Sequence, residues 1–130
     1  MSIVKDWKIA VLSKLFAEVQ GMEKVIAITL LPAMGIGQLV LLKSVLVDKV
    51  AIKNLLMVIK TINTAGDLAP LEASIKGKGF TQSASLVNFT SQLKDDKRIM
   101  LESLLADEKV GRELLEKGIS GLLDEYLYVR

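Results

Sequence analysis

The side chains that could do chemistry in this chain are lysines and carboxylates, because it contains neither cysteine nor histidine. The missing cysteines exclude disulfides and thiolate metal sites, and the missing histidines remove the commonest general base and zinc ligand. Glu113 and Glu116 are spaced like half of a carboxylate metal site, but their expected partners are Lys109, Lys117 and Arg112. We therefore expect a non-enzymatic protein with no catalytic residues, metal, cofactor or small-molecule substrate.

A sharper pattern lies in residues 49–64, which are apolar except for one polar stripe. At about 100° per residue, a helix gathers Lys49, Lys53, Lys60 and Asn63 on one side, with no acid among them. Lysines in such a row could contact a phosphate backbone or anionic headgroups, without reading base sequence. The alternative is that the stripe is only the solvent-facing edge of a buried helix.

Two further lysines, Lys76 and Lys78, lie in a Lys-Gly-Lys-Gly break in the helical pattern. The spacing is not that of a phosphate loop, so these residues could touch a phosphate only non-specifically. Charge is also unevenly spread, because residues 1–94 carry a net charge of +5 and residues 95–130 a net charge of −3. This asymmetry suits head-to-tail contacts between subunits or an anionic partner, and chance segregation on a solvated surface is the alternative.

Helical periodicity runs through the chain, and no segment alternates polar and apolar residues for long enough to indicate a strand. The length predicts a single domain over residues 1–130. We predict an all-α fold, a compact bundle of about six to seven helices around a central apolar helical hairpin formed by residues 25–64. The expected helices cover 3–20, 22–34, 38–47, 49–64, 81–94, 95–106 and 108–128, with Asp48 and Asp107 as N-caps, Gly21 and Gly66 as stops, and a helical turn near Pro70.

The most apolar stretch is residues 25–42, in which Thr29 and Gln38 are the only polar side chains. Its length is at the lower limit for a bilayer span, and Pro32, Gly35 and Gly37 break it. We expect a buried hairpin, within the monomer or within an assembly, with a membrane span as the alternative. The break is either a tight turn or a kink.

Two other segments predict contacts between subunits. Leu115, Ile119, Leu122 and Tyr126 recur at i, i+4, i+7 and i+11 of the last helix and form an apolar stripe for self-association. Residues 79–93 carry no charge, which indicates a face covered by a neighbouring subunit or by the monomer itself.

These patterns favour a non-enzymatic structural protein that self-associates through residues 25–47, residues 79–93 and the last helix, as a homo-oligomer or as a subunit of a larger particle. One alternative is a nucleic-acid-coating subunit, either a structural coat or a small ribonucleoprotein component, that binds phosphates through its lysines. Another is a membrane-associated helical protein. With no visible secretory signal and no cysteine, we expect a cytoplasmic, intracellular setting.

Overall fold

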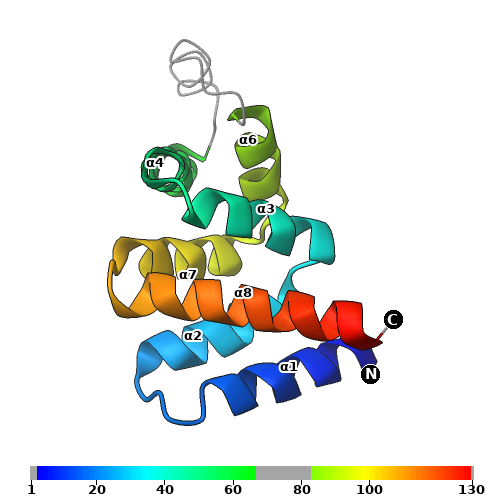
Figure 1. The fold of residues 1–130 in the computed structure, drawn as a ribbon. Helices are drawn as coiled ribbons and strands as arrows, with labels where there is room; N and C mark the ends of the chain where they lie inside the picture. The colour runs from blue at the N-terminus through cyan, green and yellow to red at the C-terminus, as the bar shows by residue number, and fades with distance from the viewer. Residues whose placement is uncertain (1–2, 67–82, 130) are drawn as a thin grey trace.

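The computed structural model describes residues 3–66 and 83–129 of the chain. Within these ranges the fold is an all-helical bundle with no strand, which confirms the predicted fold class (Figure 1). The helices are α1 (Ile3–Leu15), α2 (Met22–Leu30), the 3₁₀ helix η1 (Leu31–Ala33), α3 (Ile36–Leu46), α4 (Lys49–Ala65), α6 (Ser83–Gln92), α7 (Asp95–Ala106) and α8 (Val110–Val129). The turn expected near Pro70 lies outside the described residues.

Side-chain caps and a glycine define several helix ends as the sequence predicts. The Asp48 carboxylate accepts hydrogen bonds from the backbone N–H groups of Val50 and Ala51, at 2.9 and 3.3 Å, at the start of α4. Asp107 does the same for Lys109 and Val110, at 3.0 and 2.9 Å, and the Val110 N–H contributes most to lowering the pKa of the Asp107 carboxyl.

Of the two glycines predicted to end helices, Gly66 does so and Gly21 does not. Gly66 ends α4 with a left-handed φ of 71°. The prediction that Gly21 stops the first helix is wrong, because α1 already ends at Leu15 and Gly21 precedes α2 with a φ of 118°. Only glycine adopts such a φ readily.

The break around Pro32 is a turn rather than a kink. Pro32 stands in the first turn of η1, where its missing N–H costs nothing, and Met34 is extended before α3 begins. The Gly35 N–H donates to the side-chain oxygen of Gln38 at 3.2 Å, which fixes the start of α3. Residues 25–42 are therefore divided among α2, η1 and α3. In the described ranges, none of the helices has the length and apolarity that a bilayer span requires.

The core joins the apolar hairpin of α2, α3 and α4 to the last helix. In Figure 1, α8 crosses the front of the bundle, with α1 and α2 below it and α3 above it. It packs against α1, α2, α3 and α7, while α7 also packs against α4. Leu30, Leu42 and Leu55 of the hairpin are fully buried in one cluster with Leu115 and Leu122 of α8.

The apolar stripe of the last helix is used inside the chain. Leu115, Ile119 and Leu122 are each 0% exposed, because α8 packs against α1, α2, α3 and α7. The prediction that these three side chains join subunits is therefore wrong, since they have no surface to offer a partner. Tyr126, the fourth member of the stripe, is half-buried near the end of α8.

The uncharged segment, residues 79–93, is also partly covered by other helices of the same chain. Leu86, Phe89 and Thr90 of α6 are buried, and α6 packs against α3 and α4. Packing within the monomer thus accounts for Leu86 and Phe89, and residues 79–82 of the segment lie outside the described residues.

Glycines let the helices approach closely around α8. A Cβ atom at Gly118 would lie 2.6 Å from a methyl carbon of Leu31 and 3.1 Å from the ring of Phe16. At Gly111, a Cβ atom would overlap the carbonyl oxygen of Leu104 in α7. The α7–α8 junction therefore has no room for a larger residue at position 111, and the obstructing group is backbone that cannot rotate away.

We expect Gly111→Ala to destabilise the protein by about 1–3 kcal/mol, because the added methyl group forces α7 and α8 apart. Gly37→Ala is the matched control, since no atom lies within 4 Å of a Cβ placed there. The control should be neutral or gain up to about 1 kcal/mol from helix propensity. Urea unfolding of both variants provides the measurement, and equal stability of Gly111→Ala and the wild type would contradict the packing described.

Candidate binding pocket and charged surfaces

The predicted lysine stripe lies on the outer side of α4. Lys49, Lys53 and Lys60 are all exposed, whereas Ile52, Leu55 and Ile59 on the opposite side are buried. The sequence therefore placed these three lysines correctly on one solvent-facing edge. Lys76 and Lys78 lie outside the described residues, so the structure does not bring them to this surface or separate them from it.

Asn63, the fourth member of the stripe, belongs instead to a polar network around Arg98. Its amide donates to Glu102 Oε1 at 2.7 Å, and its oxygen accepts from Arg98 Nε at 3.1 Å. Arg98 also donates to the Leu93 carbonyl at 3.1 Å and pairs with Asp95. This buried arginine joins the end of α4 to the start of α7.

Sequence reasoning missed Arg98 because an arginine is usually exposed, and nothing in its neighbourhood distinguishes it from a surface residue. Two of its three acceptors, Asp95 and the Leu93 carbonyl, lie within five residues of it in the sequence, whereas Asn63 is 35 residues away, so only the tertiary structure reveals the link to α4. Among the side chains of residues 7–64 and 85–127, which the structure describes, Arg98–Asp95 is the one ion pair. The carboxylates of Glu113 and Glu116 thus lack the predicted ion pairs, and Arg112 donates to the Leu105 carbonyl at 2.7 Å instead.

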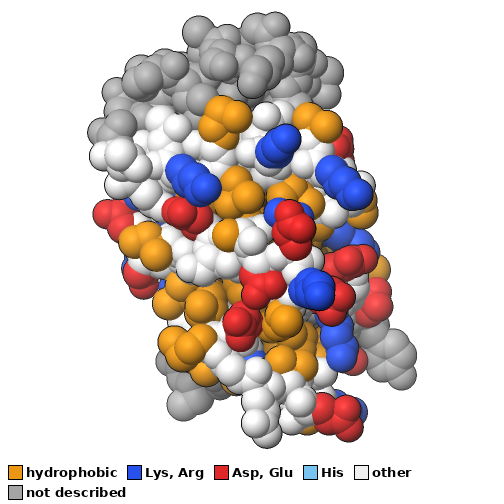
Figure 2. Space-filling view, turned by 90° about the vertical axis from the view of Figure 1, so that its left-hand side faces the viewer, with side chains coloured by type: hydrophobic (Ala, Val, Ile, Leu, Met, Phe, Trp, Pro, Cys, Tyr) orange, Lys and Arg blue, Asp and Glu red, His pale blue; other side chains and the backbone are white. Residues whose placement is uncertain are grey.

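The lysines of α4 and Lys43 of α3 form what we call the basic face, which consists of Lys43, Lys49, Lys53 and Lys60. Lys49 and Lys53 border a shallow groove of about 370 Å³ that also includes Glu108 and Arg112. In Figure 2, basic side chains lie across the upper part of the visible face, and acidic side chains lie directly below them. Because the lysines outnumber the acids in the groove, it favours an anionic partner.

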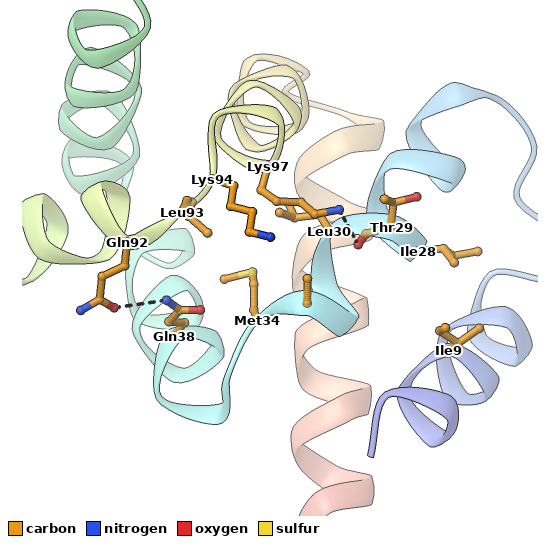
Figure 3. Close-up of a pocket in the computed structure, with 11 residues that line it drawn as sticks. Ile9, Ile28, Thr29, Leu30, Met34, Gln38, Gln92, Leu93, Lys94 and Lys97 are labelled. Carbon is orange, nitrogen blue, oxygen red and sulfur yellow. Dashed lines mark hydrogen bonds between the residues drawn. The ribbon is translucent and has the colours of Figure 1, made fainter. Parts of the chain in front are cut away.

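A larger pocket lies where the Pro32 turn meets the link between α6 and α7. It has a volume of about 630 Å³ (Figure 3). Leu30, Met34 and Leu93 are its most buried lining residues, at 0%, 1% and 8% exposure. The other lining residues are Ile9, Ile28, Thr29, Ala33, Gln38, Gln92, Lys94 and Lys97.

Two lysines supply the charge of this pocket. In Figure 3, the side chains of Lys94 and Lys97 extend from the α6–α7 link and the start of α7 toward Met34 and Thr29. Lys97 Nζ donates to the Thr29 carbonyl at 3.4 Å, which is a long hydrogen bond. None of the lining residues in the described part of the chain is acidic.

The side-chain amides of Gln38 and Gln92 lie at one end of the pocket. Gln38 donates from Nε2 to the side-chain oxygen of Gln92 at 3.4 Å, again a long hydrogen bond (Figure 3). The pocket thus combines an apolar floor, two ammonium groups and two amides, which suits binding of an anionic group with an apolar part. It contains no nucleophile–base pair, and the described ranges hold no cluster of three potential metal ligands from acidic, histidine or cysteine residues.

A third lysine supports the floor of the pocket from within the bundle. Lys8 is only 5% exposed, and its Nζ donates to the Met34 carbonyl at 2.8 Å. Burial disfavours the charged ammonium and lowers the pKa of Lys8 from its ordinary value. The Met34 carbonyl lies at the turn between η1 and α3, so this hydrogen bond holds α1 to the turn.

The lowered pKa of Lys8 predicts a stability that rises with pH. Between the folded-state pKa and the ordinary value of 10.5, the unfolded chain binds more protons than the folded chain. The cost of burying the ammonium is therefore complete below the folded-state pKa and disappears as pH rises past it. As the pH rises from neutral toward 10.5, the free energy of unfolding of the wild type should increase relative to that of Lys8→Met.

Chemical denaturation of both proteins across this range measures the difference. Lys14→Met, which removes an exposed lysine from the same helix, α1, is the matched control for the loss of one charge. A wild-type stability that falls relative to Lys8→Met over this range would contradict the described burial of the ammonium.

No protein-family model, curated protein or solved structure matches this chain. Evidence about function therefore comes from the burial, charge and geometry of the chain's own residues. Two features carry that evidence, namely the outer side of α3 and α4 and the pocket at the Pro32 turn.

Proposed function

We propose that the protein is a non-enzymatic assembly subunit that self-associates through the outer side of α3 and α4. The observation that carries this proposal is the uneven coverage of α3, a helix that is apolar on nearly all sides. Its inner side is fully covered, since Leu39, Leu42 and Val45 are 0% exposed. On its outer side Val40 is 50% exposed, and Val47 just past its end is 78% exposed.

Val50, at the start of α4, extends this apolar surface. We call Val40, Val47 and Val50 the valine edge. Single exposed apolar residues are common on soluble proteins and need no explanation. The valine edge differs from such single residues because it lies along α3 and the start of α4, and a helix like α3 that is apolar all round is usually buried on both sides. A second copy of the chain would bury the valine edge.

Charge complementarity supports a second copy as the partner. The basic face borders the valine edge, since Lys43 lies between Val40 and Val47 in the sequence and Lys49 adjoins Val50. Three acids, Glu113, Glu116 and Asp124, lie on the exposed side of α8, and we call them the acidic face. Lys117 and the 65% exposed Leu127 lie on the same side of the helix.

Because the basic face and the acidic face are different surfaces, they suit two arrangements: a reciprocal pair about a two-fold axis, or a heterologous contact in which each subunit uses one face on each neighbour. The two-fold pair closes as a dimer, whereas heterologous contacts continue until they close a ring or form an open filament. This arrangement agrees with the opposite net charges of residues 1–94 and 95–130.

We expect the double variant Val40→Glu, Val47→Glu to weaken self-association by about tenfold or more, because it puts two charges into an apolar contact. Size-exclusion chromatography with light scattering across a concentration series measures the effect. Val25→Glu is the matched control, since Val25 is 55% exposed on α2, on the other side of α8.

All these positions are exposed, so unfolding free energies should stay within about 0.5 kcal/mol of the wild type. A wild type that remains monomeric at every concentration would overturn the proposal. An oligomer that the double variant leaves intact would also overturn the role of the valine edge.

Coating of nucleic acid is a second candidate function, favoured by one observation. Lys49, Lys53 and Lys60 form an exposed row along one helix, and none of them has a carboxylate partner among the described residues. Lysines in this arrangement neutralise phosphates regardless of base sequence, and the resulting affinity falls steeply with salt.

A charge swap separates the two candidates. If the basic face meets the acidic face, Lys53→Glu and Glu116→Lys should each weaken self-association by about threefold to tenfold, and the double variant should recover most of the loss. If the lysines bind nucleic acid, Lys53→Glu should weaken binding of a single-stranded RNA oligonucleotide, and Glu116→Lys should not restore it. Lys14→Glu, on exposed α1 surface, controls for the change in net charge.

A further inference from the structure

We propose that the pocket at the Pro32 turn binds a free amphiphile, a carboxylate on a short alkyl tail. This inference does not depend on self-association, because none of the pocket's lining residues belongs to the valine edge or to the acidic face. The volume of about 630 Å³ lies within the range of small-molecule sites.

The apolar part of the ligand follows from the floor and one end of the pocket. Leu30, Met34 and Leu93 provide a buried apolar floor. Ile9 and Ile28 continue the apolar lining toward α1, at the end away from the two glutamines (Figure 3). An alkyl chain lying across this surface would cover it and displace water from it.

The anionic part follows from Lys94 and Lys97. Lys94 Nζ has no hydrogen-bond partner among the described residues, and the only hydrogen bond of Lys97 Nζ is the long one to the Thr29 carbonyl. The carboxylate of Asp95, which follows Lys94 in the sequence, pairs with Arg98. Two ammonium groups without a carboxylate partner offer charge-assisted hydrogen bonds to an anionic head.

The shape of the pocket favours a ligand that is free in solution. The site is bordered by residues from α1, α2, η1, α3 and α6, as well as by the link to α7. A lipid in a bilayer would have to leave the membrane to reach a pocket that is bordered by this many elements. A single small amphiphile can enter whole, with its head at the lysines and its tail on the floor.

Isothermal titration calorimetry of the full chain tests this inference, with sodium octanoate below its micelle concentration as the probe. Sodium acetate tests the head alone, and octyl glucoside tests the same tail with an uncharged head. We expect octanoate to bind at one site per chain and both comparison compounds to bind at least about tenfold more weakly. Absence of octanoate binding, or equal binding of either comparison compound, would overturn the proposal.

Variants of the two lysines locate the site. Lys94→Gln and Lys97→Gln should each weaken octanoate binding by about threefold to tenfold, because each removes one charged contact with the head. Lys53→Gln is the matched control, since Lys53 is an exposed lysine on α4 that does not line the pocket. A control variant that loses as much affinity as the other two would show that octanoate binds surface lysines in general, and the proposed pocket would be excluded.

Discussion

The burial of α8 is the interaction on which the rest of the structure depends. This helix touches α1, α2, α3 and α7, so it joins the two halves of the bundle. The close approach requires glycine, because Gly118 lies against Leu31 and Phe16 with no space for a side chain. The apolar stripe of α8 then fills the centre of the core. A helix in this position organises its neighbours and cannot also offer that stripe to another subunit.

The position of α8 determines which apolar surface remains at the outside. Since α8 and α4 cover the inner side of α3, the valines on the outer side stay exposed beside the lysines of α3 and α4. The surface of the protein is therefore divided. An edge that is apolar and basic lies on α3 and α4, and a side that is mostly acidic lies on α8. This division makes contact between unlike faces electrostatically favourable.

The pocket arises where two breaks in the helical pattern meet. The turn at Pro32 ends α2, the link at Leu93 ends α6, and tertiary packing brings these segments together although they are distant in the sequence. Buried polar groups hold both breaks in place, since Lys8 binds the Met34 carbonyl and Arg98 binds the Leu93 carbonyl. Each of these long side chains satisfies a carbonyl that no helix can satisfy, which explains why they are buried.

The sequence by itself determined the helical class, most helix ends and the outward side of α4, because periodicity, caps and glycines act over a few residues. Asp48, Asp107 and the α4 lysines are examples. It could not determine which apolar stripe is buried, since Leu115 and Val40 are equally suited to a core or to an interface. Nor could it find the contact of Lys8 with Met34, the contact of Arg98 with Asn63, or the pocket, because each of them joins segments that are distant in the sequence. Only tertiary structure decided these features, because burial depends on which helices meet, and the apolar pattern of one helix does not specify its neighbour.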